Sequence, residues 1–162
     1  MKKMIAIIAL LGVSGITSAC SAEDMTLEEA VKAWSFMKGT WIVTTPDGMT
    51  DEVRGRLNSA KNAVVTDSKK AFHVFGWDPK TKMLEIQSFM DTGTRGKTLC
   101  VKTAKNEITC KEGYMISPEG DEIPFESEAK FTAVDANTYE FTMNGATWIM
   151  NRKAKPATKD KK

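Results

Sequence analysis

The chain has 162 residues, of which 41% are hydrophobic and 27% are charged. These values exclude an intrinsically disordered chain and fit one globular domain. The net charge of +2 is unevenly distributed, because residues 20–152 hold 16 basic and 20 acidic residues, a net charge of −4. A strongly basic surface for nucleic acid is therefore excluded for the body of the protein.

The first residues have the layout of a secretory signal. Lys2 and Lys3 precede a nearly unbroken apolar run from Met4 to Ile16, and small residues follow it. The run is shorter than the roughly 20 apolar residues that a transmembrane helix needs. This pattern predicts a signal peptide over residues 1–19 and an exported protein.

The end of this segment, Ser18-Ala19-Cys20, resembles the end of a bacterial lipoprotein signal. The resemblance implies that Cys20 is lipidated and that residues 20–25 form a tether to a membrane. Acyl chains would hold the protein there, since each buried CH₂ contributes roughly 0.8 kcal/mol. The expected location is the cell envelope, as an outer-membrane lipoprotein facing the periplasm. Ordinary cleavage near Ala19 or Ala22 would instead give a soluble periplasmic or secreted protein.

Two further cysteines, Cys100 and Cys110, flank a short polar segment, Ala104-Lys105-Asn106. If this segment forms a turn, the two cysteines face each other on antiparallel strands, within reach of a disulfide. We expect that bond in an oxidising compartment, and free buried cysteines are the alternative. Two cysteines and one distant histidine are too few ligands for a metal site, so no metal and no cofactor is expected.

A short helix is predicted between Thr26 and Gly39. Thr26 and Glu29 form a capping box, and apolar residues then recur at helical spacing up to Met37. Gly39 stands where a helix would end.

From Thr40 onward, short runs of Val, Ile, Thr and aromatic residues alternate with turn residues, which predicts about nine antiparallel strands. The connections are too short for crossover helices. Alternating apolar residues predict one strand over residues 122–133 and another over 139–143. A sheet of this size must close into a barrel or fold into two layers in order to cover its apolar face.

The segment Gly39-Thr40-Trp41, which follows the helix and opens the first strand, resembles the Gly-x-Trp start of lipocalin-like (calycin) barrels. In that family a basic residue at the end of the last strand packs across the tryptophan, and Arg152 stands at that place. Other segments, such as Gly76-Trp77-Asp78-Pro79, resemble bacterial lipocalin-like domains of unassigned function. The resemblance implies a mainly β fold: an antiparallel up-and-down barrel of about 8–10 strands over residues 26–152. The lysine-rich residues 153–162 are expected to form a disordered tail.

A barrel of this size is either packed solid or holds one small ligand. Methionine and aromatic residues on inward positions suit an adaptable apolar cavity. The sequence therefore suggests a non-enzymatic protein that binds a small apolar or amphipathic molecule; the alternative is a protein–protein interaction module with a packed barrel. The candidate lining residues are Phe125, Phe131, Tyr139, Phe141, Met143, Trp148 and Met150.

No catalytic motif stands out in the chain. The sequence contains no nucleophile elbow, phosphate-binding glycine loop or metalloprotease helix. His73 is the only histidine, and it lies in the apolar run Ala71-Phe72-His73-Val74-Phe75, which favours a partly buried structural role. The alternative is a haem ligand, as in haem-carrying relatives of this barrel type.

Overall fold

The computed structural model describes residues 25–154 and contains a short helical segment followed by eleven strands. The helical segment is α1 (Leu27–Ala33) and a 3₁₀ turn, η1 (Trp34–Met37). The strands are β1 (Gly39–Thr44), β2 (Thr50–Leu57), β3 (Val64–Asp67), β4 (Ala71–Asp78), β5 (Met83–Met90), β6 (Arg95–Ala104), β7 (Glu107–Ile116), β8 (Glu122–Pro124), β9 (Ala129–Ala133), β10 (Thr138–Met143) and β11 (Ala146–Arg152).

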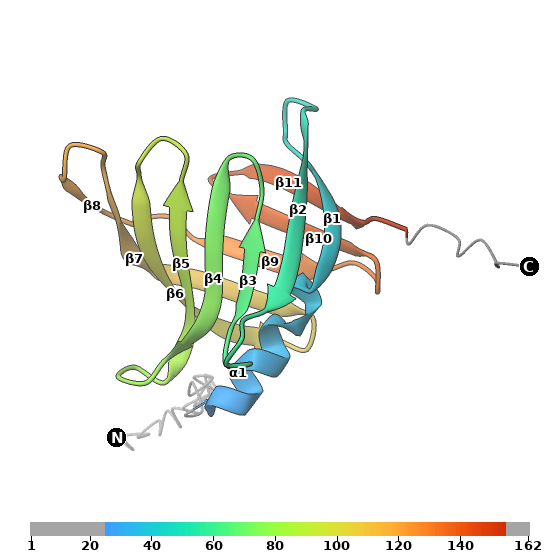
Figure 1. Ribbon diagram of the computed structural model, residues 1–162, viewed down its shortest axis with the longest axis horizontal. Coiled ribbons are helices and arrows are strands. Elements are labelled where there is room, and N and C mark those ends of the chain that lie inside the picture. The colour runs from blue at the N-terminus through green and yellow to red at the C-terminus, as the bar shows by residue number, and fades with distance from the viewer. Residues whose placement is uncertain (1–24, 155–162) are drawn as a thin grey trace, which may run out of the picture.

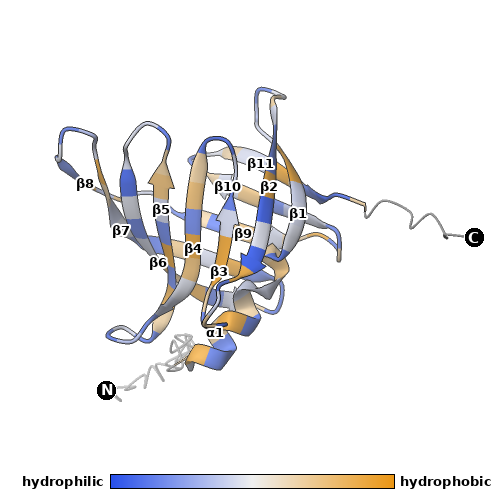
Figure 2. Ribbon diagram, viewed as in Figure 1, coloured by the Kyte–Doolittle hydropathy of each residue, from blue (hydrophilic) through white to orange (hydrophobic). Residues whose placement is uncertain are grey.

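Ten of these strands form a closed antiparallel barrel. Neighbours in sequence pair from β1 to β7, β7 then pairs with β9, and β11 pairs with β1 to complete the ring. The strands enclose an interior, and α1 lies at one end of the barrel (Figure 1). Apolar and polar residues alternate along the strands (Figure 2), as expected for a sheet with one face inside and one in water. The predicted fold class, a mainly β antiparallel barrel with one short helix, is confirmed.

Some sequence predictions concern residues that the structure does not describe. The signal segment 1–19, Cys20 and nearly all of the tether lie outside the described residues, as do residues 155–162 of the lysine-rich tail. Within the described part of the chain, no helix has both the length and the apolar character needed to span a bilayer.

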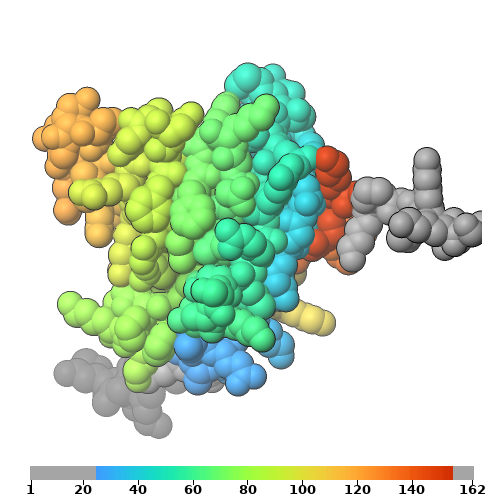
Figure 3. Space-filling model, viewed as in Figure 1, coloured from blue at the N-terminus to red at the C-terminus, as the bar shows by residue number. Residues whose placement is uncertain are grey.

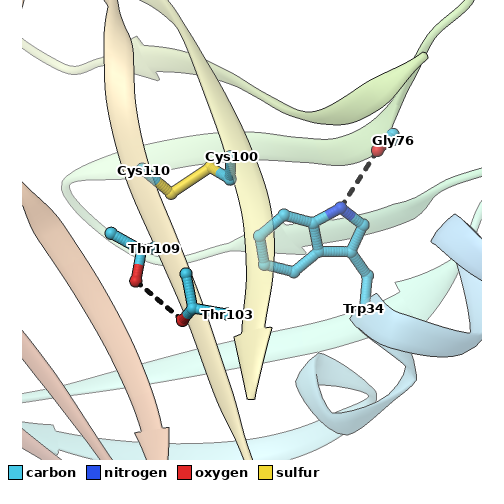
Figure 4. The surroundings of a disulfide bond; sticks show 6 residues. All are labelled: Trp34, Gly76, Cys100, Thr103, Thr109 and Cys110. Atoms are coloured by element: carbon cyan, nitrogen blue, oxygen red, sulfur yellow. Dashed lines mark hydrogen bonds between the residues drawn. A yellow bond between two sulfur atoms is a disulfide. The ribbon is translucent and has the colours of Figure 1, made fainter. Parts of the chain in front are cut away.

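The predicted capping box starts α1. The Thr26 hydroxyl accepts a hydrogen bond from the Glu29 backbone N–H, and the Glu29 carboxylate accepts one from the Thr26 N–H at 2.9 Å. These bonds satisfy backbone donors that the first helical turn leaves free. The helix then tightens into η1, which directs Trp34 into the barrel end. Trp34 is fully buried and donates from Nε1 to the Gly76 carbonyl at 3.0 Å (Figure 4).

The helix end of the barrel is closed by Arg152 and Trp41, the pair implied by the lipocalin-like resemblance. The Arg152 guanidinium carbon lies 4.1 Å from the centre of the fully buried Trp41 ring. Its nitrogens donate to the backbone carbonyls of Lys38 at 2.8 Å and Phe36 at 3.2 Å. Arg152 therefore covers Trp41 and also fastens the helical segment to the last strand.

Gly55 on β2 permits this close approach. A Cβ atom at that position would lie 1.8 Å from the carbonyl oxygen of Met37. The end of η1 therefore rests directly on the backbone of β2, and only glycine leaves the necessary space.

The single strand predicted over residues 122–133 is wrong. The segment forms two strands, β8 and β9, that pair with opposite halves of the ten-residue β7. Proline cannot supply a backbone donor to a continuing ladder, and Pro124 is the last residue of β8. β8 extends beyond the ring as a hairpin partner of β7, so Ile123 is 53% exposed rather than inside.

The expected disulfide joins Cys100 on β6 to Cys110 on β7 (Figure 4). The two residues are paired across the strands, next to a register shift between Leu99 and Cys100. Both cysteines are 1% exposed and belong to the hydrophobic core. The bond thus links two neighbouring strands inside the barrel wall.

Replacing Arg152 by methionine tests the closure of the barrel end. Arg152→Met removes two charge-assisted hydrogen bonds and the cation–π contact, and we expect a loss of about 2 kcal/mol in the free energy of unfolding. Urea denaturation measures it. The control is Lys153→Ala, which removes only the surface ion pair with Glu52 and should cost less than about 1 kcal/mol. Equal losses in the two variants would contradict the assigned role.

The disulfide can be tested by counting thiols. Protein denatured without reductant should expose two fewer free thiols than protein denatured after reduction. The double variant Cys100→Ala, Cys110→Ala should unfold about 2–3 kcal/mol more easily, because the unfolded chain regains the freedom of the closed loop. Equal thiol counts in the two samples would show that the bond is absent.

Candidate functional site

The interior of the barrel contains a cavity of about 560 Å³. Every strand of the ring contributes to its wall, including β1 with Val43 and β11 with Met150, the two strands whose pairing closes the ring. The cavity extends to Asn144, in the turn before β11. Because Arg152 at the far end of β11 contacts the helical segment, Asn144 lies at the barrel end opposite α1.

Large aromatic side chains pack together inside the barrel at the end next to the helical segment. Trp34 and Trp41 are fully buried there, and the Phe75 ring centre lies 5.0 Å from that of Trp34. Phe131 meets Trp34 edge to face with ring centres 6.0 Å apart. Edge-to-face and tilted aromatic pairs of this kind stabilise a packed layer. This aromatic layer forms the floor of the cavity, since Phe75 and Phe131 also line it.

Six of the seven residues proposed for the lining do line the cavity. They are Phe125, Phe131, Phe141, Met143, Trp148 and Met150. Phe141 stands between two of the others, with ring centres 4.7 Å from Phe131 and 5.4 Å from Trp148.

Tyr139 does not line the cavity, although it shares a strand face with Phe141. It lies near the helix end of β10, where its ring stacks on Phe36 of η1 with centres 4.3 Å apart. The same ring meets Trp41 edge to face. Burial raises the pKa of the Tyr139 phenol. Tyr139 therefore belongs to the closed end of the barrel.

A row of polar residues crosses one wall of this apolar cavity. Thr66, His73 and Ser88 lie on β3, β4 and β5 and are direct cross-strand partners. The His73 Nδ1 atom lies 3.0 Å from the Ser88 hydroxyl oxygen, within hydrogen-bond distance. The Thr66 side chain is fully buried, and its hydroxyl has no partner among the described residues. Sequence reasoning did not single out Thr66 or Ser88.

His73 is held in its neutral form. Burial lowers the pKa of its imidazole from 6.5 to about 4, because the charged form would lose its hydration. An imidazole with so low a pKa is a weak base at neutral pH. The His73–Ser88 pair is therefore better suited to hydrogen bonding than to proton abstraction.

The cavity offers no positive charge to a guest. Among the described residues that line it, none is lysine or arginine, and the only acidic one is the exposed Glu126. Within the described chain, no cluster of three or more His, Cys, Asp or Glu side chains is arranged to hold a metal ion. The wall is thus apolar apart from Glu126 and a few uncharged hydrogen-bonding groups.

A second hollow lies at the helix end of the barrel, between the helical segment and the β6–β7 turn, and it reaches the inward-facing residues Ile108 and Phe131. It measures about 780 Å³ and is lined by polar and charged side chains together with Phe36 and Tyr139. The positively charged lining residues are Lys32, Lys102, Lys105 and Arg152, and the negatively charged ones are Glu29 and Glu107. Because residues of both charges line it, this hollow shows no clear preference for one class of ligand.

Comparison with known proteins adds no family assignment: no protein-family model matches this chain, and no curated protein matches it.

The neutral state of His73 predicts a pH-dependent stability. Below pH 6.5 the unfolded chain binds a proton at His73 that the folded chain does not, so the free energy of unfolding falls as the pH drops toward 4. The full shift corresponds to about 3 kcal/mol. Urea denaturation across this range should show a steeper fall for the wild type than for His73→Gln, in which all the carboxylates are retained. Parallel curves for the two proteins would contradict a neutral, buried His73.

Proposed function

We propose that this protein binds a small apolar or amphipathic molecule inside its barrel and acts as a carrier or receptor for it. The supporting observation is the cavity of about 560 Å³, walled by aromatic and methionine side chains. This size falls within the range of about 300–1,000 Å³ that is usual for small-molecule sites. Burying an apolar guest there would release water from both surfaces, which favours binding.

Packed aromatic rings and a covalent bond support the site. The aromatic layer and the Arg152–Trp41 closure fix the floor, and the disulfide fixes part of the wall. A wall that is already formed before binding loses little conformational freedom when a guest enters. Methionines such as Met143 and Met150 add local adaptability, because their unbranched side chains change shape easily.

The alternative is an interaction module that uses the outer surface of the barrel. One observation favours it: Phe72 and Phe89 are cross-strand partners on β4 and β5, exposed by 38% and 44%, with ring centres 6.1 Å apart. Two rings form a small patch, whereas surfaces that bind proteins expose larger apolar areas. The internal cavity therefore gives the stronger argument.

The proposed place of action is the bacterial cell envelope. This proposal is supported by the signal-like residues 1–19 and by Cys20, the candidate for lipidation. The Cys100–Cys110 pairing agrees with it, since disulfides persist in oxidising compartments. A lipid anchor on Cys20 would place the barrel at a membrane surface, where apolar molecules are available.

Filling the cavity from one wall tests the proposed function. The neutral apolar dye N-phenylnaphthylamine should bind the wild type saturably, with a rise in fluorescence. Val43→Trp places a large ring in the cavity and should weaken dye binding by about tenfold. The matched control is Val134→Trp at a position that is 57% exposed, where binding should not change.

Met143→Trp fills the cavity from another strand and replaces Val43→Trp if that variant does not fold, as judged by circular dichroism. Absence of saturable dye binding to the wild type would refute the proposal. Unchanged binding in a folded cavity-filling variant would do so as well.

A further inference from the structure

The row formed by Thr66, His73 and Ser88 is the only place on the described cavity wall where three polar side chains are paired across adjacent strands. The register aligns Thr66 with His73 and His73 with Ser88, so the three residues face the cavity side by side. Elsewhere the wall is formed mainly by aliphatic, aromatic and methionine side chains. A guest that is wholly apolar would leave this row without new hydrogen bonds.

Thr66 is the residue of the row whose buried hydroxyl lacks a hydrogen-bond partner within the described part of the chain. It has no exposed surface, and its hydroxyl forms no hydrogen bond with the described residues. A buried hydroxyl without a partner is destabilising, because it has given up its hydrogen bonds to water. A guest with a hydrogen-bonding group at this position would restore one of those bonds.

His73 and Ser88 extend the same hydrogen-bonding capacity along the row. Their mutual contact of 3.0 Å occupies Nδ1 of the imidazole. Within the described chain, Nε2 has no hydrogen-bond partner, and it is a donor or an acceptor depending on the tautomer. Thr66 and Ser88 hydroxyls can likewise donate or accept. The row is therefore able to bind a head group that both donates and accepts, such as an alcohol.

The charges on the cavity wall favour an uncharged head group over an ionised carboxylate. An ionised carboxylate would enter a space with no lysine or arginine on its described wall and with Glu126 as the only charged lining residue. Moving a charge out of water without a partner of opposite sign is strongly unfavourable. An uncharged head loses much less hydration and still satisfies the row.

We propose that the Thr66–His73–Ser88 row recognises the head of a single-chain amphiphile that is uncharged and carries a hydroxyl group, in preference to the ionised carboxylate of the same chain length. The inference rests on the proposed function, since it assumes that the cavity accepts apolar guests. It adds the chemical class of the guest and the residues that select it.

The test uses displacement of N-phenylnaphthylamine by dodecanol and by dodecanoate at neutral pH. The measured quantity is the ratio of the affinity for dodecanol to the affinity for dodecanoate. Each compound leaves water equally readily whichever variant is present, so a change in this ratio between variants reports on the protein alone. In the wild type, dodecanol should bind about tenfold more tightly or better. Thr66→Val and Ser88→Ala should each weaken dodecanol about fivefold and leave dodecanoate unchanged, because each removes one hydrogen-bonding group.

The control is Met143→Leu, which alters the apolar wall on β10 and should shift both affinities alike. Thr66→Val should fold at least as well as the wild type, since it removes the unpartnered hydroxyl and keeps the shape of the side chain. Ser88→Ala provides a second, independent variant.

The outcomes separate this inference from the proposed function. If the dye binds and neither compound displaces it, or if dodecanoate binds as tightly as dodecanol, the assigned head-group preference is wrong. It is equally wrong if the affinity ratio is the same in the wild type, Thr66→Val and Ser88→Ala. If the wild type does not bind the dye at all, the proposed function itself is refuted.

Discussion

The contact between Arg152 and Trp41 is the constraint on which the rest of the molecule depends. The guanidinium covers the indole ring and donates to the carbonyl of Phe36 in η1 and to that of Lys38, which joins η1 to β1. One side chain thus links the end of the last strand, the start of the first strand and the helical segment. Because β1 and β11 are the strands that complete the ring, this contact stabilises the closure of the barrel as well as its end. The side chains available for packing are concentrated there, where Trp34 and Phe75 join Trp41 in the core.

Because the large aromatic rings are concentrated at the helix end, the cavity lies toward the opposite end of the barrel. Aromatic rings pack together beside the helical segment, whereas the side chains farther along the barrel surround the interior cavity. An unfilled interior lacks the contacts that stabilise a solid core. The covalent link between β6 and β7 offsets part of that loss by restricting the unfolded chain. Figure 3 shows that the outer face remains continuous over β2–β6, with the helical residues against its lower end.

The features that could be predicted from the sequence are those set by a few residues close together in the chain. Thr26 and Glu29 define a capping box within four positions, and the two cysteines flank one turn. Arg152 and Trp41 were found by resemblance to lipocalin-like barrels, because no local pattern connects residues so far apart. Pro124 was the available signal that residues 122–133 do not form one strand. Tyr139 was assigned to the cavity because strand alternation shows which face of the sheet a residue lies on. It does not show how far along the barrel axis the residue lies, and at its position Tyr139 contacts Phe36 instead of the cavity.

Thr66 and Ser88 were missed for a related reason. Threonine and serine on a strand are usually assigned to the wet face, and no sequence rule distinguishes an inward hydroxyl from an outward one. Only the register shows that both residues flank His73 on the inner surface. His73 itself was correctly interpreted as partly buried, but its hydrogen bond to Ser88 depends on that pairing.

The polar row and the interior cavity are two aspects of the same arrangement. In a solid barrel, a buried threonine hydroxyl without a partner would be a defect that a valine of the same shape would remove. In a barrel with an interior cavity, Thr66 belongs to the cavity wall, and we propose that a guest reaching its hydroxyl supplies the partner. The proposed binding would account for both the unpartnered Thr66 hydroxyl and the cavity, whereas a protein that uses only its outer surface would account for neither.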